Sequence, residues 1–536
     1  MSNPPETPIL VGIGDINDRA SKGRDDAAEP LTLMLRAIGA AIQDTTLGPE
    51  AAQKLQAAIE SVSVVANWTW PYPNAPELLV QRLGLPGAVH THESHHGGDS
   101  PGQLFDEAAR RVAYRKSKVA VVTGAEALAS LEFFKKAKKF PPPHWTKLQD
   151  YTSIWDRKRA EDAGTRHFLG APIQVYPLYE AAFRAHLQQK LSDNHKESAE
   201  LYADFAQVAS KSPYSWSYGQ EPETAESIAT VTKRNRMICS PYPLLMNAFN
   251  TVNLGAACIL TTTSFARELG IPESKWIYPL GGAGTSDSSF WERPYFHGSR
   301  SLSDSLDAAL KASNIRTEDI DLFDFYSCFP IVPKLAAHHL GLPLHNAKPI
   351  TVLGGLTSFG GAGNNYSLHA ITEITRQLRT RKQPSTFSQP QTEAGKRSTG
   401  LVLANGGVLS YHHTVLLSTQ PRPDSTYPMW NPLPSRLDEV HPVIVEHAEG
   451  GCVIETYTVQ FGRDGSPVLG FVIGRLQSES GPQAGNQDGG RFIANVEDPY
   501  TLQQLCSNNE QIGKQGFVTS DRDSGRNLFV FQQSKI

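Results

Sequence analysis

Cysteine is scarce in this chain, and the few cysteines are scattered. The 536 residues include five of them, Cys239, Cys258, Cys328, Cys452 and Cys506, and no two stand in a CxxC spacing. A disulfide framework or a structural zinc site needs closely and regularly spaced cysteines. We therefore expect no metal site, and a reducing, intracellular environment.

The sequence also lacks a long apolar segment and an excess of either charge. Residues 1–19 hold no basic stretch, and their only apolar run, residues 9–13, is too short for a signal peptide or a membrane span. The 50 basic residues nearly balance the 54 acidic ones, so no overall field would capture nucleic acid or a membrane surface. We expect neither nucleic acid nor a membrane span to be involved in its function.

What the sequence does contain is an alternation of strand and helix patterns that occurs twice. The first half predicts, in chain order, a strand at 9–14, a helix at 31–43, a strand at 61–65, helices at 75–83 and 102–114, and a strand at 119–122. The second half predicts a helix at 303–313, a strand at 322–325, a helix at 332–340, a helix to about 378 and a strand at 401–403. The pattern indicates an α/β fold made of two copies of one layout.

Two glycine-rich turns occupy matching places in the two halves, at residues 97–101 and 354–365. Glycines before a helix let backbone N–H groups approach a ligand, and the positive end of the helix dipole favours a developing oxyanion. We expect each turn to open a helix, and the two together to form the floor of the active site. The substrate-binding candidates are Gly97, Gly98, Asp99, Ser100, Gly360, Gly361, Asn364 and His369.

Shifts in composition predict the domain boundaries. We expect a first half at 1–270 that contains an inserted loop domain at 128–243, a second half at 271–418, a proline-rich linker at 419–436 and an additional β domain at 437–536. The insertion carries four lysines between residues 135 and 139, which form either a solvated face or a contact for a nucleotide-bearing substrate.

The last 100 residues predict about six short strands, enough for a small barrel of the oligonucleotide- and oligosaccharide-binding (OB) type. This region has 7 basic and 13 acidic residues, a balance that argues against binding to a phosphate backbone. We expect the barrel to dock on the core and to have a structural or gating role.

The last three residues, Ser534, Lys535 and Ile536, differ by one conservative change from the peroxisomal address Ser-Lys-Leu. Two interpretations stay open: a peroxisomal import signal, or a chain end that matches by chance in a cytoplasmic protein.

Together these features resemble the thiolase superfamily, and most of all the thiolase-like proteins related to sterol carrier protein thiolases that have an additional C-terminal domain. Residues 324–330 stand in the place of the family's Asn-Glu-Ala-Phe or His-Asp-Cys-Phe motif, residues 360–362 in that of Gly-His-Pro, and residues 404–407 in that of Cys-x-Gly-Gly. The resemblance covers the whole chain. It implies a duplicated thiolase fold of α/β/α/β/α layers and a coenzyme A thioester as substrate or ligand, with no tightly bound cofactor.

The resemblance also implies that the usual thiolase mechanism is lost. The nucleophilic cysteine falls on Gly97, the Gly-His-Pro histidine becomes Gly361, and the second cysteine becomes Ala404. The Asn or His that helps to build the oxyanion hole becomes Tyr326. Because residues that act as a unit cannot be removed one by one with activity retained, we expect thiolysis to be absent or residual.

The remaining catalytic candidates are His95, His96, Tyr326, Cys328 and Asn365. A histidine next to a carboxylate can act as a general base, while the alternatives for this loop are a hydrogen-bonded polar cluster and metal binding. Cys328 either replaces the lost nucleophile or is an inert buried thiol. Asn365 is placed to donate to a thioester oxygen, whereas His369 fits a core position equally well.

Two functions are compatible with the sequence. The first is an acyltransferase of lipid or secondary metabolism, which passes an acyl group from CoA or a carrier directly to an acceptor, with His95 or His96 as base and the glycine-turn amides as oxyanion hole. The second is a non-catalytic pseudo-thiolase that binds acyl-CoA or lipid as a carrier or partner. Thiolases commonly dimerise through a sheet edge, so a homodimer is one option, unless the additional domain covers that edge.

Overall fold

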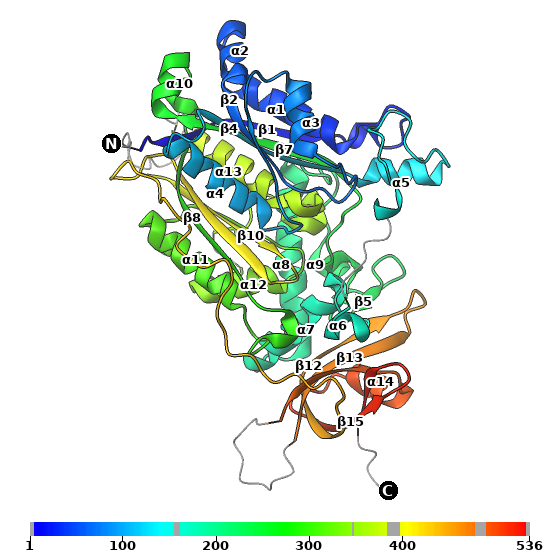
Figure 1. The fold of residues 1–536 in the computed structure, drawn as a ribbon. Helices are drawn as coiled ribbons and strands as arrows, with labels where there is room; N and C mark the ends of the chain where they lie inside the picture. The colour runs from blue at the N-terminus through cyan, green and yellow to red at the C-terminus, as the bar shows by residue number, and fades with distance from the viewer. Residues whose placement is uncertain (1–4, 155–160, 346–347, 383–396, 478–488, 532–536) are drawn as a thin grey trace, which may run out of the picture.

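The computed structural model describes residues 5–154, 161–345, 348–382, 397–477 and 489–531. Its main body contains two β-sheets that face each other across a layer of helices (Figure 1). The first sheet has the order β1 (Pro8–Asn17), β7 (Asn253–Thr262), β4 (Val119–Ala127), β2 (Ile59–Val64) and β3 (His90–Glu93). The second has the order β8 (Tyr278–Ser286), β11 (Tyr411–Ser418), β10 (Thr399–Gly406) and β9 (Leu322–Phe325).

The pairing of the strands confirms the predicted duplication. In the first sheet β1 is antiparallel to β7, β7 is antiparallel to β4, and β4 is parallel to β2. In the second sheet β8, β11, β10 and β9 repeat these relations in the same order. The sequence patterns missed β7, β8 and β11, because these strands are buried on both faces, and β7 and β8 are rich in Gly and Ala, so they lack the usual alternation.

Helices complete the five layers expected of a thiolase fold. The two central helices, α4 (Ser100–Ala113) and α13 (Tyr366–Lys382), lie between the sheets (Figure 1). The outer face of the first sheet is covered by α1 (Pro30–Asp44), α2 (Pro49–Ala57) and α3 (Ala75–Leu83), with α10 (Thr263–Leu269) at one end, and that of the second by α11 (Arg300–Ser313) and α12 (Ile331–Leu340). Because α4 lies between two sheets, ten of its residues are buried, where a surface helix buries one stripe.

The two glycine turns enter their helices differently. The first turn leads directly into α4, with Pro101 in the first turn of the helix, where its missing N–H costs nothing. The second turn forms a π-helical turn at Gly355–Gly360 and a 3-10 turn at Gly363–Asn365 before α13 begins. The expectation of a direct helix start is wrong there, because Gly354, Gly355 and Gly360 have φ angles of 97°, 73° and 116°, which a regular helix does not allow.

The segment between β4 and β7 forms a helical subdomain. Its elements are α5 (Leu128–Lys136), α6 (Ala163–Arg166), α7 (Pro172–His186), α8 (Leu191–Lys211), α9 (Ala225–Ala229), β5 (Met237–Cys239) and β6 (Tyr242–Pro243). A fully buried ion pair attaches it to the second half: Lys334 Nζ on α12 lies 2.9 Å from Glu180 Oε1 on α7. The Ser198 hydroxyl accepts a further hydrogen bond from Lys334, and the Tyr242 hydroxyl donates to Glu180. Every charge in this cluster therefore has a partner.

The C-terminal region forms a closed barrel of five strands: β12 (Gly450–Phe461), β13 (Pro467–Leu476), β14 (Arg491–Val496), β15 (Gln515–Asp521) and β16 (Arg526–Val530). β12 pairs with both β13 and β15, and β14 pairs in parallel with β16, which closes the ring. Helix α14 (Pro499–Leu505) precedes β15. The OB-like barrel is confirmed, but the strand expected at 443–445 forms only an isolated bridge between Ile444 and Arg491, since Val443 beside it is 75% exposed.

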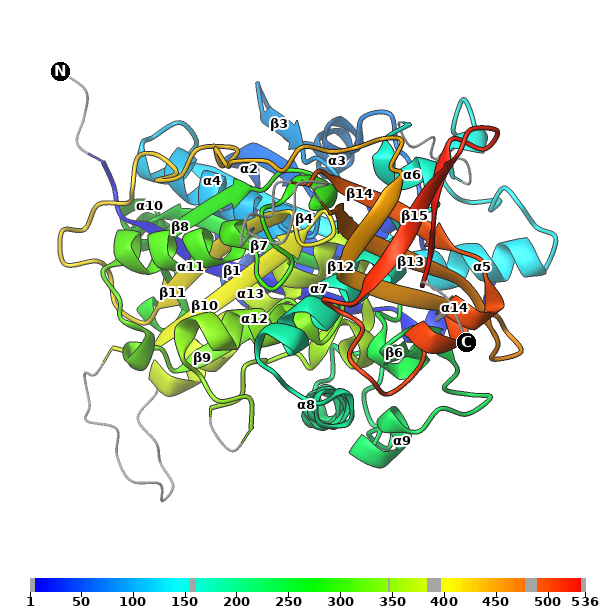
Figure 2. The ribbon, with the colours of Figure 1, turned by 90° about the horizontal axis from the view of Figure 1, so that it is seen from below.

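The barrel packs against the inserted helices, as both views show (Figure 2). The Thr456 hydroxyl on β12 donates to the carbonyl of Leu178 on α7, and the Asn495 amide on β14 donates to the carbonyl of His167 next to α6. Phe471 and Ile473 of β13 belong to the main hydrophobic core. The interface is therefore part of the protein interior.

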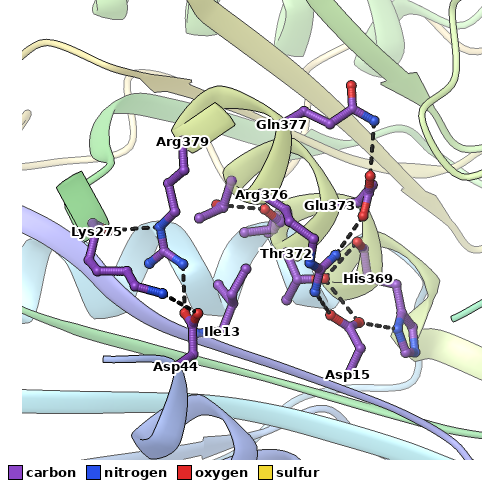
Figure 3. A network of polar contacts seen from close by, with 12 residues as sticks. Ile13, Asp15, Asp44, Lys275, His369, Thr372, Glu373, Arg376, Gln377 and Arg379 are labelled. Carbon is purple, nitrogen blue, oxygen red and sulfur yellow. Dashed lines mark hydrogen bonds and ion pairs between the residues drawn. The ribbon is translucent and has the colours of Figure 1, made fainter. Parts of the chain in front are cut away.

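Each central helix is bound by a buried ion cluster to the sheet of the other half. On α13, His369 Nδ1 and Arg376 Nη2 each lie 2.7 Å from Asp15 on β1 (Figure 3). On α4, Asp106 accepts hydrogen bonds from His413 Nε2 on β11 at 2.9 Å and from the Tyr427 hydroxyl at 2.6 Å. Both carboxylates are buried, so both need these partners to stay ionised.

Figure 3 also shows a second set of pairs beside the first, in which Asp44 at the end of α1 binds Arg379 of α13 and Lys275. Burial alone would raise the pKa of Asp15, but its hydrogen bonds and ion pairs with His369 and Arg376 outweigh burial and lower that pKa below its ordinary value. The stabilisation from this group is therefore complete above the ordinary aspartate pKa of about 3.9 and is lost as the pH falls toward the lower, folded-state value.

We predict that Asp15→Asn destabilises the main body by about 3–5 kcal/mol at pH 7, because His369 and Arg376 would lose their buried counter-ion. Urea unfolding followed by tryptophan fluorescence measures the change. The control is Asp26→Asn, which removes an exposed carboxylate paired with Arg24 and should leave the midpoint unchanged. Small and equal shifts of the unfolding midpoint in Asp15→Asn and Asp26→Asn would contradict the prediction.

Candidate functional site

The place of a side chain at Gly97 is filled by two neighbouring residues. A Cβ built on Gly97 would collide with Asp99 Oδ1 and would lie 2.8 Å from His95 Nε2. His95 Nε2 itself lies 3.3 Å from Oδ1 and 3.2 Å from Oδ2 of Asp99. The carboxylate is buried, and the imidazole is 47% exposed. The hydrogen bond from Asp99 raises the pKa of His95 above its ordinary value against the opposing effect of burial, so this pair, the His95–Asp99 dyad, has the form of an oriented general base.

A hydroxyl donor lies next to the dyad. A Cβ built on Gly98 would lie 2.7 Å from the Tyr326 hydroxyl oxygen and would collide with the backbone oxygen of Asn405, so the chain at this point requires glycine. Tyr326 follows β9 directly and is buried, and burial raises its pKa well above the ordinary value of 10. The phenol therefore stays protonated and can donate a hydrogen bond to an oxyanion.

Asn250 occupies the place that a side chain at Gly361 would take. A Cβ built on Gly361 would collide with Asn250 Oδ1. The Gly361 amide donates to the carbonyl of Phe249 at 2.8 Å, and the Gly355 amide donates to the Tyr366 hydroxyl at 3.1 Å. These amides are therefore committed to holding the second glycine turn. The amides at the N-terminus of α4 also have partners: the Ser100 amide donates to the carbonyl of Gly97 and the Gln103 amide to that of Asp99, while Pro101 has no N–H.

The two adjacent histidines face different partners. His96 Nδ1 lies 3.1 Å from Asn364 Nδ2, and its ring centroid is 5.0 Å from that of Trp68. The Trp68 indole in turn donates to Asn364 Oδ1 at 2.7 Å. Since Asn364 belongs to the second glycine turn, this contact brings the two turns together, as the sequence analysis expected of the site floor. Ser100 supports the first turn by donating its hydroxyl to the carbonyl of His95.

Cys328, Asn365 and His369 are buried and already have partners. Burial raises the pKa of the Cys328 thiol to about 12, and its Sγ lies 3.8 Å from Asn405 Nδ2, so Cys328 carries no thiolate at neutral pH. The Asn365 amide donates to the carbonyl of Gly124 on β4 at 2.9 Å. His369 is bound to Asp15 in the ion cluster of α13. None of these three side chains touches the dyad through a hydrogen bond among the residues that the structure describes.

A cavity of about 480 Å³ lies on the far side of Tyr411 from the dyad's own contacts: Tyr411 lines it, whereas His95 and Asp99 are not among its lining residues. Its walls come from three places: the insertion between Asp162 and Gly170, the segment after β8 between Ser286 and Trp291, and the turn between β10 and β11, with Arg436 at one side. Tyr411, one of the lining residues, has its ring centroid 5.5 Å from that of His95 in an edge-on contact. Sequence reasoning missed Tyr411, because its only mark was its position six residues after the start of the Asn-Gly-Gly sequence at Asn405.

Within the described ranges no cluster of three or more His, Cys, Asp or Glu side chains is arranged to hold a metal ion. No helix in the same ranges is both long and apolar enough to cross a bilayer.

Comparisons with known proteins bear on the fold and on the C-terminal domain. A family model for the additional C-terminal domain of type 1 thiolase-like proteins matches residues 432–523. The crystal structure of a monomeric SCP2-thiolase-like protein type 1 from Mycobacterium smegmatis is 29% identical, aligns over 99% of this chain and 100% of that chain, and has a TM-score of 0.77. Residues 432–523 thus match the additional C-terminal domain of type 1 thiolase-like proteins, and the chain as a whole is similar to the M. smegmatis protein.

More distant structures share the fold of this chain. The Ltp2–ChsH2(DUF35) aldolase is 18% identical with a TM-score of 0.55, and the dimeric peroxisomal thiolase of Saccharomyces cerevisiae is 12% identical with a TM-score of 0.51. Each aligns over 77% of this chain and 98% of its own. No curated relative matches the sequence. These neighbours include a monomer and a dimer, so a homodimer of the present chain stays a prediction.

We predict that incubation with acyl-CoA leaves no acyl group on the protein and that 3-ketoacyl-CoA is not thiolysed, because the family's nucleophile position holds Gly97 and the Cys328 thiol stays protonated. Intact-mass analysis and release of acetyl-CoA measure the two outcomes. Iodoacetamide serves as the reactivity control: the exposed Cys506 should be alkylated well before the buried Cys328. An acyl adduct mapped to Cys328 would contradict this assignment.

Proposed function

We propose that the protein binds a CoA thioester beside the first glycine turn and passes its acyl group directly to an acceptor. The observation that carries this proposal is the dyad, which fills the space of a side chain at position 97. A thiolase offers a thiol there, whereas this chain offers a base. An acyl transfer that needs no covalent intermediate fits that exchange.

In the proposed reaction, His95 takes the proton of an acceptor O–H or N–H group while that atom attacks the thioester carbon. Asp99 holds the imidazole and stabilises the imidazolium that forms. The oxyanion of the tetrahedral intermediate accepts a hydrogen bond from the Tyr326 hydroxyl. When the intermediate collapses, the CoA thiolate leaves and receives the proton from His95, so the protein returns to its starting state.

The acceptor would occupy the cavity beside Tyr411. The cavity is connected to His95 through Tyr411, which lines it and contacts the His95 ring, and it has aromatic walls from Phe290 and Trp291 and hydroxyl groups from Ser288 and Ser410. A mixed lining of this kind suits a medium-sized organic acceptor.

The loss of every thiolase nucleophile also supports the alternative, a non-catalytic carrier of acyl-CoA or lipid. A base with an oxyanion donor and no nucleophile would serve retro-aldol cleavage of a β-hydroxyacyl thioester as well, and one of the proteins that share this fold is an aldolase, Ltp2–ChsH2(DUF35). The only support for a role in peroxisomal lipid metabolism is the tail Ser534, Lys535 and Ile536, and this tail lies outside the described residues.

The deciding experiment measures CoA release from a panel of acyl-CoAs and one β-hydroxyacyl-CoA, with and without alcohol and amine acceptors. We expect His95→Ala to lower acceptor-dependent CoA release by about 100-fold or more while CoA-thioester binding persists. His92→Ala, an exposed histidine on β3, is the matched control, and His96→Ala tests the neighbouring histidine. Binding without release under every condition would favour the carrier, and failure to bind any CoA thioester would refute both functions.

The pH dependence provides a separate prediction. A general base acts in its neutral form, so CoA release should rise with pH through the pKa of His95, which Asp99 raises above the ordinary 6.5. Asp99→Asn removes the charge that raises this pKa, so we expect the rising limb to move to lower pH and the maximal rate to fall at least about tenfold. A pH profile that is unchanged in Asp99→Asn would exclude His95 as the base.

A further inference from the structure

The turn between β10 and β11 has a strained backbone. Gly407, Val408 and Leu409 follow one another with φ angles of 58°, 53° and 68°. The left-handed region suits glycine, but it is a genuine outlier for a β-branched residue such as Val408. Strain of this kind persists only where the surrounding structure holds the backbone in place.

This strained turn touches both members of the dyad. A Cβ built on Gly406 would lie 2.5 Å from Asp99 Oδ1 and 2.6 Å from the amide nitrogen of Gly98, so the turn packs directly on the carboxylate. At the other end of the turn, Tyr411 contacts the His95 ring. The position of residues 406–411 therefore sets how His95 and Asp99 meet.

One buried side chain holds the turn from behind. Arg293 Nη2 donates to the carbonyl of Leu409 at 2.7 Å and to the Ser410 hydroxyl at 2.8 Å. Arg293 is 2% exposed, and its charge is balanced by Asp287 at 3.6 Å. On the opposite side, the Tyr176 hydroxyl accepts a hydrogen bond from the Leu409 amide at 3.2 Å.

The backbone that carries Arg293 is held by the barrel. Arg491, at the start of β14, is fully buried and donates to the carbonyls of Trp291, Arg293 and Pro294. Glu455 of β12 fixes the guanidinium by accepting from its Nε at 2.6 Å. Only the planar fork of arginine reaches several carbonyls at once, and a lysine in the same place presents a single point charge.

We propose that the additional C-terminal domain positions the dyad through these two arginines acting in series. Arg491 fixes the segment 291–294, Arg293 in that segment fixes the strained turn, and the turn fixes His95 against Asp99. Arg491 and Arg293 are thus positioning residues, and the barrel is a part of the site that never contacts a substrate. The barrel has more acidic than basic residues, which disfavours binding to a phosphate backbone and is compatible with a domain that acts on the rest of the chain.

Hydrogen–deuterium exchange of the full-length protein tests the proposal without any substrate. In Arg491→Lys we expect the amides of residues 407–411 to exchange about tenfold faster, and the same in Arg293→Lys. The matched control is Arg475→Lys, since Arg475 also binds Glu455, at 2.7 Å, but from the strand β13. Because the two arginines act in series, the double variant should exchange no faster than the faster single variant.

A second readout separates positioning from a general loss of stability. The pKa of His95, followed by NMR of its imidazole, should fall toward its ordinary value in Arg491→Lys, because a loosened turn weakens the contact with Asp99. The pKa should stay unchanged in Arg475→Lys, even if the melting temperature of that variant is lower.

Two results would overturn the proposal. The first is faster exchange in Arg491→Lys that is confined to the barrel and residues 291–294, with residues 407–411 and the His95 pKa as in the wild type. The second applies if Arg491→Lys does not fold, because Arg293→Lys alone then decides. If residues 407–411 exchange at the wild-type rate in Arg293→Lys and the His95 pKa is unchanged, the two arginines do not position the dyad. Neither readout depends on acyl transfer, so failure of the proposed function would leave this result standing.

Discussion

The burial of α4 and α13 between two sheets is the constraint on which the rest of the structure depends. A helix in that position buries most of its side chains, so a buried charge on it needs a partner in the sheet that covers it. Asp106 of α4 finds one in His413, and His369 and Arg376 of α13 find one in Asp15. Each carboxylate joins a helix of one half to a sheet of the other, so the clusters also set the relative position of the halves. Since each glycine turn directly precedes one of these helices, the candidate site inherits its geometry from them.

Around this frame, neighbouring side chains fill the space beside two glycines of the site. The volume at Gly97 is taken by His95 and Asp99, and that at Gly361 by Asn250. Protein interiors tolerate few voids, so the loss of a large side chain is stabilised when a neighbour moves into the space. Reinstating one thiolase residue would therefore displace its replacement before it restored any chemistry.

The sequence predicted most of the fold, because its patterns are local. The elements β9 and α3 lie where they were expected, and the five barrel strands follow the predicted order. It could not predict β7 or β8, whose Gly and Ala residues pack between layers without an alternating pattern. The partners of single side chains were also out of reach. His95 and His96 are equivalent in sequence, but one meets Asp99 and the other Asn364, and Arg491 has no local feature that distinguishes it from a surface arginine.

The bond between Asp15 and His369 spans 354 residues of sequence, and this has a consequence for synthesis. Ribosomes add about 5–20 residues per second, so β1 leaves the ribosome roughly 20–70 s before its counter-charge exists. During that interval the first sheet has an unpaired carboxylate on a face that will later be interior, and neither half has its final core. The first half therefore lacks the partner of Asp15 until the second half is made, so the two halves expressed separately would each lack part of this ion cluster.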